Sequence, residues 1–304
     1  MTIQYLVTGA AGGVAGISRL VVDKLLGHGA SVRAMVHTDD ARADALRTLG
    51  ADVVVGDLTN PADVATAAES ADRVFFNMSV STQYVEATAV VCSVLRMNPD
   101  LQVLVNMSQM TVSQMTATST DESHQQRLQW LAEQVVDWST LPAVHIRPTI
   151  LLENPLFTMF AAQSVRDHDT LALPFGKGKT SPVAADDVAA VVATVLLDPN
   201  PHVGKVYELT GPETLDLDQL AQRYTRALGR TIVAETPSES EWSARMDAEP
   251  LPPHVRQHLE TMARLHRDDR YNRSTDTVEQ LTGRRAQTVD DYLRAHRDMF
   301  EDKR

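Results

Sequence analysis

The chain has 304 residues, of which 43% are hydrophobic and 22% charged, and this ordinary globular composition excludes a disordered, collagen-like or coiled-coil protein. Because 28 Lys and Arg stand against 40 Asp and Glu, the net charge is -12 and the surface repels phosphate backbones, so we expect no nucleic-acid partner. The single cysteine, Cys92, excludes an internal disulfide and a Cys-x-x-Cys site, and with no signal peptide or membrane span predicted we expect a cytoplasmic protein.

The first half of the chain alternates short runs of Val, Ile and Leu with Ala- and Leu-rich segments of helical spacing. The runs predict strands over Gln4–Thr8, Ser31–Val36, Asp52–Val55, Arg73–Asn77, Leu101–Asn106 and Ala143–Arg147. The segments between them predict helices over Val14–Leu26, Asp39–Leu49, Pro61–Glu69, Thr82–Met97 and Glu122–Trp138. Strands that alternate with helices across short polar joints are parallel and covered on both faces, so we expect an α/β fold with a doubly wound sheet.

Beyond Arg147 the predicted elements become shorter, because prolines interrupt the pattern repeatedly. Two helices stand out, over Ala184–Leu197 and Leu217–Leu228, and Gly229 follows the second as glycine often does. The polar remainder, Glu235–Arg304, predicts further helices. We therefore expect a sheet-forming part over residues 1–150 and a smaller, mainly helical part over residues 151–304, some of whose elements return to the sheet.

A glycine-rich loop, Thr8-Gly9-Ala10-Ala11-Gly12-Gly13-Val14-Ala15-Gly16, follows the first predicted strand and opens the first predicted helix. Gly9 permits a tight turn, Gly12 lets a diphosphate approach the backbone, and the helix N-terminus supplies free N–H groups. At the first strand-to-helix turn of an alternating chain, such a loop is typical of dinucleotide binding. A glycine-rich turn without a ligand is the alternative.

The end of the second predicted strand indicates which dinucleotide binds. An acid there would accept the ribose 2′-hydroxyl, whereas a cation would bind a 2′-phosphate. His37 follows that strand, Arg33 lies within it and Arg42 comes shortly after. No acid occurs before Asp39 and Asp40. This favours NADP(H) over NAD(H), and the alternative is that both arginines are surface charges without a ligand.

The third predicted strand ends in Gly56-Asp57-Leu58. At this end of a parallel sheet, Asp57 is placed to meet the edge of an adenine ring, with Leu58 beside it. A helix cap or turn is the alternative for Asp57, since Asp is common at both.

Two other patterns do not make a site. Gly178-Lys179-Thr180 ends like a phosphate-binding loop, but Leu173 stands where that loop needs its first glycine. His254 and His258 are four residues apart on a predicted helix, yet the sequence offers no third zinc ligand nearby. We therefore expect no metal.

Several motifs together resemble the NmrA-like branch of the atypical short-chain dehydrogenases/reductases. The resemblance covers residues 1 to about 230 and implies a Rossmann domain over residues 1–150 that binds NADP(H), with a smaller C-terminal domain over residues 151–304 that forms the substrate cleft. The motifs are the glycine loop, Val32-Arg33-Ala34-Met35-Val36, Gly56-Asp57-Leu58, Ala132-Glu133-Gln134, Leu141–Thr149 with its Arg147-Pro148-Thr149, Val183–Val188, and Gly204-Lys205-Val206-Tyr207-Glu208-Leu209-Thr210-Gly211.

The resemblance also implies individual roles. His37 takes the place where the family often has a phosphate-binding Arg. The remaining cofactor-binding positions that it implies are Gly9, Ala11, Gly12, Gly13 and Val14 at the diphosphate, Asn77, Met78 and Ser79 beside the ribose, Met107 and Ser108 near the nicotinamide, and Pro148 and Thr149 at the carboxamide.

The usual proton donor of the wider superfamily is missing. No Tyr-x-x-x-Lys occurs, and Gln129, which cannot transfer a proton, stands where this branch often has Lys or His. The catalytic candidates are therefore Ser108, His124 and, through its charge, Arg127. Histidine titrates near neutrality, and His124 follows Gln109–Thr120, a Ser-, Thr- and Met-rich segment that predicts a mobile loop over the cleft. A solvent-facing loop or cap is the alternative for His124.

The residues leave three functions open. The first is an NADPH-dependent reductase that passes hydride to a quinone, enone or other conjugated carbonyl compound, because such acceptors can take their proton from water. The second is a regulatory NADP(H)-binding protein with a protein partner, and the third, weaker because it needs a proton-shuttling pair, is an epimerase that retains NAD. We expect a small-molecule substrate and no membrane association, and a homodimer remains an option.

Overall fold

The computed structural model describes residues 3–12 and 16–301. They form two compact units, each assembled from separate stretches of chain. We call the first the sheet unit, which comprises Met1–Val112, Gln125–Pro148 and Ala185–Glu208. We call the second the helical unit, which comprises Ser113–His124, Thr149–Ala184 and Leu209–Arg304. The predicted role of the second unit in forming a substrate cleft stays a prediction.

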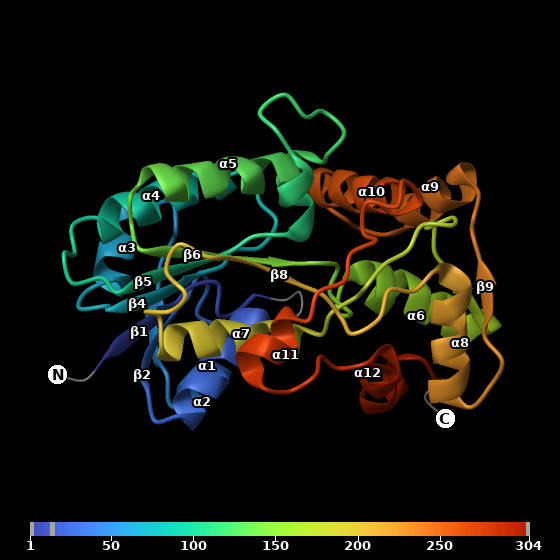
Figure 1. Ribbon diagram of the computed structural model, residues 1–304, viewed down its shortest axis with the longest axis horizontal. Helices are drawn as coiled ribbons and strands as arrows, with labels where there is room; N and C mark the ends of the chain where they lie inside the picture. Colours follow the sequence, from blue (N-terminus) through green and yellow to red (C-terminus); the bar gives the residue numbers. More distant parts are fainter. Residues whose placement is uncertain (1–2, 13–15, 302–304) are drawn as a thin grey trace. The chain divides into compact units, whose positions relative to one another are not determined.

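A seven-stranded sheet forms the centre of the sheet unit (Figure 1). Its strand order is β3-β2-β1-β4-β5-β6-β8, and every pairing from β3 to β6 is parallel. The order reverses between β1 and β4, where the chain crosses from one half of the sheet to the other. The strands are β1 (Gln4–Val7), β2 (Ser31–Val36), β3 (Asp52–Val55), β4 (Arg73–Phe76), β5 (Val103–Met107), β6 (Ala143–Pro148) and β8 (Val206–Leu209).

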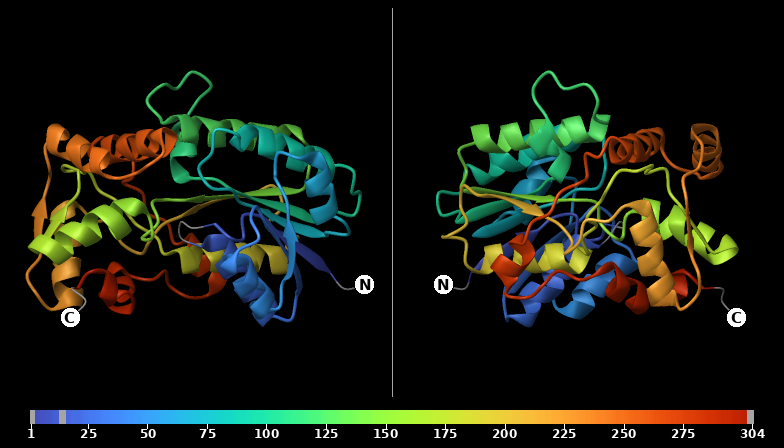
Figure 2. Two further views of the ribbon diagram at one scale, coloured as in Figure 1. Left: turned by 180° about the vertical axis from the view of Figure 1, so that it is seen from behind. Right: turned by 45° about the vertical axis from the view of Figure 1, so that its right-hand side comes forward.

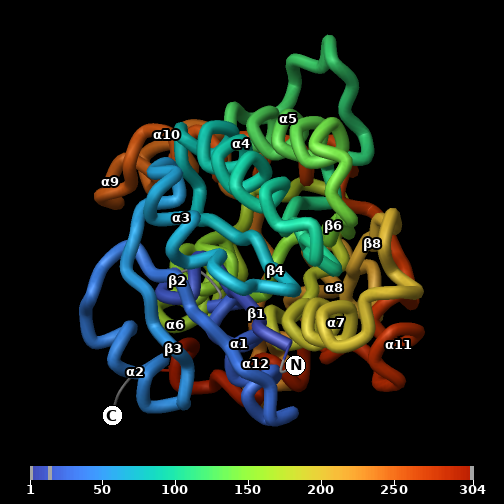
Figure 3. Tube along the Cα trace, turned by 90° about the vertical axis from the view of Figure 1, so that its left-hand side faces the viewer, coloured from blue at the N-terminus to red at the C-terminus, as the bar shows by residue number. Residues whose placement is uncertain are grey.

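Helices cover both faces of this sheet. On one face lie α1 (Ile17–Gly27), α2 (Ala41–Leu49) and α7 (Ala185–Leu197), and on the other lie α3 (Pro61–Ala67), α4 (Tyr84–Leu95) and α5 (His124–Trp138), as Figures 1 and 3 show. Every residue of β4 and β5 is buried, because central parallel strands lose both faces to helices. The expected α/β fold with a doubly wound parallel sheet is therefore confirmed.

Local signals set where the helices begin and end. The Asp40 carboxylate caps α2 by accepting the Arg42 backbone N–H, and Asn60 caps α3 in the same way. Gly50 ends α2 in the left-handed conformation that glycine adopts readily. Asp40 and Asn60 lie in the connections at the carboxyl edge of the sheet, whereas Gly50 lies in the connection that enters β3 at the amino edge.

The helical unit contains a second, two-stranded parallel sheet and most of the C-terminal helices (Figure 2). Its core is apolar and aromatic, with Phe157, Phe160, Phe175, Tyr224 and Phe300 all buried. The elements are η2 (Leu156–Ala161), α6 (Ala162–His168), β7 (Thr170–Ala172), α8 (Leu217–Leu228), β9 (Val233–Glu235), α9 (Glu239–Ala248), α10 (Pro253–Arg267), α11 (Thr277–Thr282), α12 (Val289–Ala295) and η3 (Arg297–Met299).

The six strands and seven helices predicted from the pattern are all present, with ends that shift by up to three residues. The pattern missed β7, β8 and β9, each of three or four residues. In β8, Val206 is exposed and Tyr207 and Glu208 are half-buried, so this edge strand lacks the continuous apolar run of a central strand. Among the helices of the described residues, none is long and apolar enough to cross a membrane.

A buried arginine in the middle of the sheet holds α7 in place. Arg73 of β4 is 8% exposed, and its Nη1 donates to the carbonyls of Leu196 and Leu197 at 2.7 Å each. The same guanidinium donates to the Tyr5 hydroxyl at 3.1 Å and to Gln102 Oε1 at 2.8 Å. A cation at the C-terminus of a helix also meets the negative end of its dipole.

We expect Arg73→Met to lower the free energy of unfolding by about 2–3 kcal/mol, because it leaves buried carbonyls without their charged donor. Arg19→Met, at an exposed position of α1, is the matched control and should change it by less than about 0.5 kcal/mol. Urea titration followed by circular dichroism measures both values. Equal stabilities of the two variants would show that the Arg73 contacts contribute nothing.

Candidate functional site

The sheet unit has a cavity of about 380 Å³ at the carboxyl ends of its first strands, where the strand order reverses. In open α/β sheets this switch point is where ligands bind. The lining residues come from the end of β2, from the loops after β1, β2, β3 and β4 and from the start of α2: Gly9, Ala11, Gly12, Met35, Val36, His37, Thr38, Arg42, Gly56, Asp57, Leu58, Met78, Ser79, Ser81 and Gln83.

Gly9 and Gly12 leave the floor of this cavity without side chains. Gly9 has φ +63°, and a Cβ there would lie 2.5 Å from the Asn77 carbonyl oxygen, so no other residue fits. A Cβ on Gly12 would lie 3.0 Å from the Gly9 carbonyl oxygen. The backbone is thus accessible where the sequence predicts a diphosphate. Gly13 and Val14, the other two residues predicted there, lie outside the described residues.

Asn77 fastens the glycine loop to the end of β4. The Thr8 hydroxyl donates to the Asn77 carbonyl at 2.9 Å and accepts the Asn77 backbone N–H at 3.0 Å. The Asn77 side-chain amide donates to Ser18 Oγ on α1 at 2.9 Å. Its side chain therefore braces the loop and does not line the cavity, whereas Met78 and Ser79 do.

Among the polar residues predicted to select the nucleotide, His37, Arg42 and Asp57 line the cavity. Asp57 Oδ1 accepts the Thr59 backbone N–H and hydroxyl at 2.8 Å each, and these bonds lower the pKa of its carboxyl. Asp57 thus closes a turn and also lines the cavity together with Leu58, and its contact with an adenine edge stays a prediction.

Arg33 does not line the cavity. Its guanidinium donates to Asp52 Oδ2 at 2.9 Å and to the carbonyls of Ala67 and Glu69 at 3.1 and 2.9 Å. These contacts tie β2 to β3 and to the end of α3. These donors serve the sheet unit itself, and a contact of Arg33 with the cofactor stays a prediction.

Ser108, the catalytic candidate after β5, is buried, and its hydroxyl has no hydrogen-bond partner among the described residues. Its backbone N–H donates to the Ile146 carbonyl at 2.8 Å. The preceding residue, Met107, is buried, does not line the cavity and accepts the Tyr84 hydroxyl at its carbonyl at 3.0 Å. Burial raises the pKa of the Tyr84 phenol.

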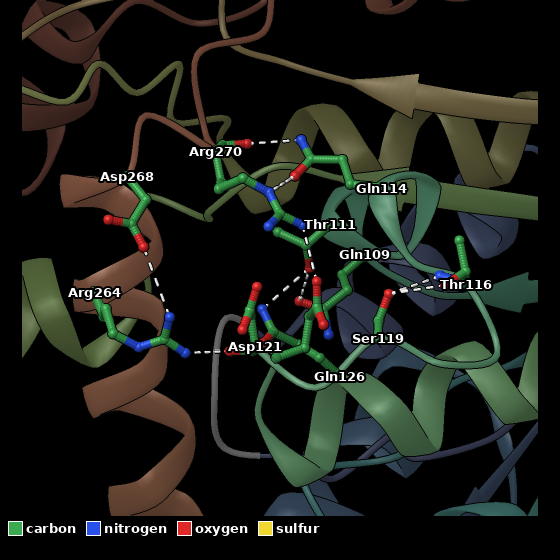
Figure 4. Close-up of polar contacts among 11 residues, drawn as sticks. Gln109, Thr111, Gln114, Thr116, Ser119, Asp121, Gln126, Arg264, Asp268 and Arg270 are labelled. Atoms are coloured by element: carbon green, nitrogen blue, oxygen red, sulfur yellow. Dashed lines mark hydrogen bonds and ion pairs between the residues drawn. The ribbon is translucent and has the colours of Figure 1, made fainter.

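Neutral amides are hydrogen-bonded to one another starting from Gln109, the residue after Ser108, a feature that the sequence indicated only through Gln129. The Gln109 amide donates to Gln129 Oε1, and its own Oε1 accepts the Thr111 hydroxyl at 3.1 Å. Gln126 Nε2 in turn donates to Thr111 Oγ1 at 3.1 Å (Figure 4). Gln129, which stands where the resemblance implies Lys or His, thus accepts a hydrogen bond from another neutral amide.

The other two catalytic candidates lie on α5. His124 is its first residue and is exposed, and its backbone N–H donates to Gln257 Oε1 at 3.2 Å. Arg127, one turn later, is half-buried. Because His124 belongs to the helical unit and Arg127 and Ser108 to the sheet unit, their action on one substrate stays a prediction.

The segment Ser113–His124 is anchored within the helical unit (Figure 4). Arg270 pairs with Glu122 at 2.8 Å and exchanges hydrogen bonds with Gln114. Arg264 donates to the Asp121 carbonyl. The prediction of a mobile loop over Gln109–Thr120 did not anticipate these anchors or the 3-10 helix η1 (Met110–Gln114).

Further polar contacts hold the end of this segment. Ser123 Oγ and His258 Nδ1 share a hydrogen bond of 2.7 Å, and burial lowers the pKa of His258 to about 4. Within the described residues, no group of three His, Cys, Asp or Glu side chains is arranged to hold a metal ion.

The last two predicted cofactor contacts follow β6. Pro148 is the buried final residue of that strand, and Thr149 is buried with a hydroxyl that has no partner in the described part of the chain. The Thr149 backbone N–H donates to the Leu209 carbonyl at 2.9 Å. Their contact with a carboxamide stays a prediction.

Comparisons with known proteins agree with this geometry. A family model described as NAD(P)H-binding matches residues 9–199. The NAD(P)H azoreductase of Xenophilus azovorans is 26% identical over 300 residues, which cover 98% of this chain and 99% of that protein.

Two solved structures share the fold. The NADPH-dependent quinone oxidoreductase of Escherichia coli, solved with NADPH, superposes with a TM-score of 0.82 at 21% identity and covers 97% of this chain and 100% of that one. NmrA, a negative transcriptional regulator solved with NADP, superposes with a TM-score of 0.80 at 19% identity and covers 96% and 94%. The chain therefore belongs to the NAD(P)H-binding family, whose model covers more than half of it, and it shares the Rossmann-type α/β fold of these two structures.

Proposed function

We propose that this protein is an NADPH-dependent reductase that transfers hydride to a quinone, an enone or another conjugated carbonyl compound. The observation that carries the proposal is the glycine-floored cavity at the switch point of the sheet, with His37 and Arg42 in its wall. The full-length similarity to an azoreductase supports a reductase, and the quinone oxidoreductase shows that the same fold hosts one.

The residues of the cavity fit a dinucleotide. Gly9 and Gly12 expose backbone for the diphosphate, and Asp57 with Leu58 can meet the adenine. His37 and Arg42 supply the polar groups that a 2′-phosphate needs. When bound, the reduced nicotinamide supplies a hydride, the two-electron equivalent that the acceptor takes up.

At the reacting end the chain itself offers hydrogen bonds and no strong acid. The unpartnered Ser108 hydroxyl can donate to a carbonyl oxygen of the acceptor and orient it, and the proton that completes the reduction comes from water. Conjugated acceptors suit this arrangement, because their delocalised oxyanion needs less acid catalysis than that of a simple ketone.

The rival function is regulation without turnover. The structural neighbour NmrA is a transcriptional regulator that was solved with NADP, and the amide pair Gln109–Gln129 stands where a proton donor is often found. A screen of NADPH oxidation against quinones, enones and ketones separates the two functions. Selective turnover supports the reductase, whereas tight NADPH binding without turnover across the panel would favour the regulator and its protein partner.

We expect Gly12→Asp to abolish binding of NADPH and NADH, because the added carboxylate places bulk and negative charge where the diphosphate lies. Gly27→Asp is the matched control, since Gly27 is exposed and a Cβ there meets nothing. Isothermal titration calorimetry on both variants, after circular dichroism has shown that they are folded, measures the effect. Unchanged affinity in Gly12→Asp would remove the cavity as the nucleotide site.

We expect Ser108→Ala to lower kcat/KM about 10- to 100-fold and to leave the Kd of NADPH unchanged, as loss of a hydrogen bond that aligns the acceptor would. Ser139→Ala, which removes another buried hydroxyl, is the control and should retain activity. His124→Gln, measured in parallel, should keep the pH profile of turnover if water is the proton source. A profile that flattens near neutrality would instead make His124 the donor.

A further inference from the structure

Arg42 is held at the cavity wall by contacts on both of its sides. Its Nη1 donates to the carbonyl of Ala11 in the glycine loop at 2.9 Å. Its Nε lies 3.0 Å and its Nη2 2.6 Å from Asp40 Oδ2, and the backbone N–H of Arg42 donates to Asp40 Oδ1 at 2.9 Å. Asp40 therefore occupies the side of the guanidinium that presents two donors to an oxyanion.

The Asp40 carboxylate is negatively charged at neutral pH. The hydrogen bond from the Arg42 side chain is the largest cause that lowers the pKa of this carboxyl, to about 2. Both side chains are partly exposed, Arg42 by 57% and Asp40 by 34%, so a bound anion can reach them. A phosphate that approached Arg42 would have to share it with an existing carboxylate.

We propose that Asp40 limits the preference of this site for NADP(H) over NAD(H), by competing with the 2′-phosphate for the Arg42 guanidinium. This inference rests on the proposed function, because it assumes that a dinucleotide fills the cavity. The wild-type protein then binds both cofactors with similar affinity, since the added phosphate gains a contact with Arg42 and loses energy by repulsion from Asp40. Cofactor choice in this chain is set by the pair and not by the arginine alone.

A direct contact of Asp40 with the ribose hydroxyls would also favour NAD(H), but by another route. In that case the loss of the carboxylate weakens NADH, whereas loss of a competitor strengthens NADPH and leaves NADH unchanged. The two routes therefore differ in which affinity changes. The contacts of Asp40 favour competition, because both of its carboxylate oxygens already accept hydrogen bonds from Arg42.

Asp40→Asn is the decisive variant. Asparagine keeps the cap of α2, because its amide oxygen can still accept the Arg42 backbone N–H, so the helix is preserved while the charge is removed. The neighbouring Asp39 provides the matched control, since its carboxylate pairs with Arg47 at 2.7 Å. Asp39→Asn removes the same charge one residue away without touching the Arg42 pair.

The experiment measures the Kd of NADPH and of NADH by calorimetry for the wild type, Asp40→Asn, Asp39→Asn and the double variant Asp40→Asn/Arg42→Met. We expect Asp40→Asn to tighten NADPH about tenfold, as a charge-assisted contact freed from competition would, and to change NADH less than about twofold. Asp39→Asn should leave the ratio of the two affinities within about twofold of wild type. The double variant should lose the gain.

An equal shift in Asp40→Asn and Asp39→Asn would overturn the inference in favour of a general charge effect, and a gain that survives in the double variant would exclude Arg42 as the contested group. A loss of NADH affinity in Asp40→Asn would assign the carboxylate to the ribose. If Asp40→Asn tightens NADPH as predicted but no acceptor is turned over, the competition between Asp40 and the 2′-phosphate is supported and the proposed reductase function is contradicted. If the wild type binds neither NADPH nor NADH, both the competition and the reductase function are contradicted.

Discussion

The approach of the glycine loop to the end of β4 is the constraint on which the rest of the site depends. The loop can pass the Asn77 carbonyl only because residue 9 has no side chain and adopts a positive φ. Thr8, Asn77 and Ser18 then lock the loop to β4 and to α1 through hydrogen bonds. This contact sets the position of the glycine loop, which forms one wall of the cavity, while residues after β2 and β3 form the others.

Much of the sheet could be predicted from the sequence, because its central strands have a recognisable hydrophobic pattern. Arg73–Phe76 and Val103–Met107 are buried on both faces and are largely apolar, so a simple pattern finds them. The glycine loop could be predicted equally well, because steric limits on the backbone turn require glycine at particular positions of the loop. The edge strand β8 was not predicted from the sequence. Val206 faces solvent, and the pairing of β8 with β6 depends on residues that are far away in the chain.

The site was only partly predictable, and the two arginines show why. Arg33 and Arg42 carry the same charge and lie nine residues apart, yet one is bound by Asp52 and two carbonyls of its own unit and the other lines the cavity. Nothing in the local sequence distinguishes them, because the difference arises from which strand and helix end each guanidinium can reach. The hydrogen bond between Gln109 and Gln129 could not be predicted either, because no sequence spacing indicates that an amide in a loop will meet an amide on a helix.

The contacts of Arg73 also bear on how the chain reaches its native state. The helix whose C-terminus Arg73 contacts comprises residues 185–197. In the chain it follows Thr149–Ala184, which belong to the helical unit, and the rest of that unit begins at Leu209. Each unit thus interrupts the other. During synthesis, β4 leaves the ribosome more than a hundred residues before α7, the helix whose carbonyls accept hydrogen bonds from Arg73. The sheet unit therefore cannot fold completely until α7 has been made. A chain cut near residue 150 would lose α7 from one face of the sheet and the two carbonyl partners of the buried Arg73, and we expect the exposed apolar surface to make it aggregate.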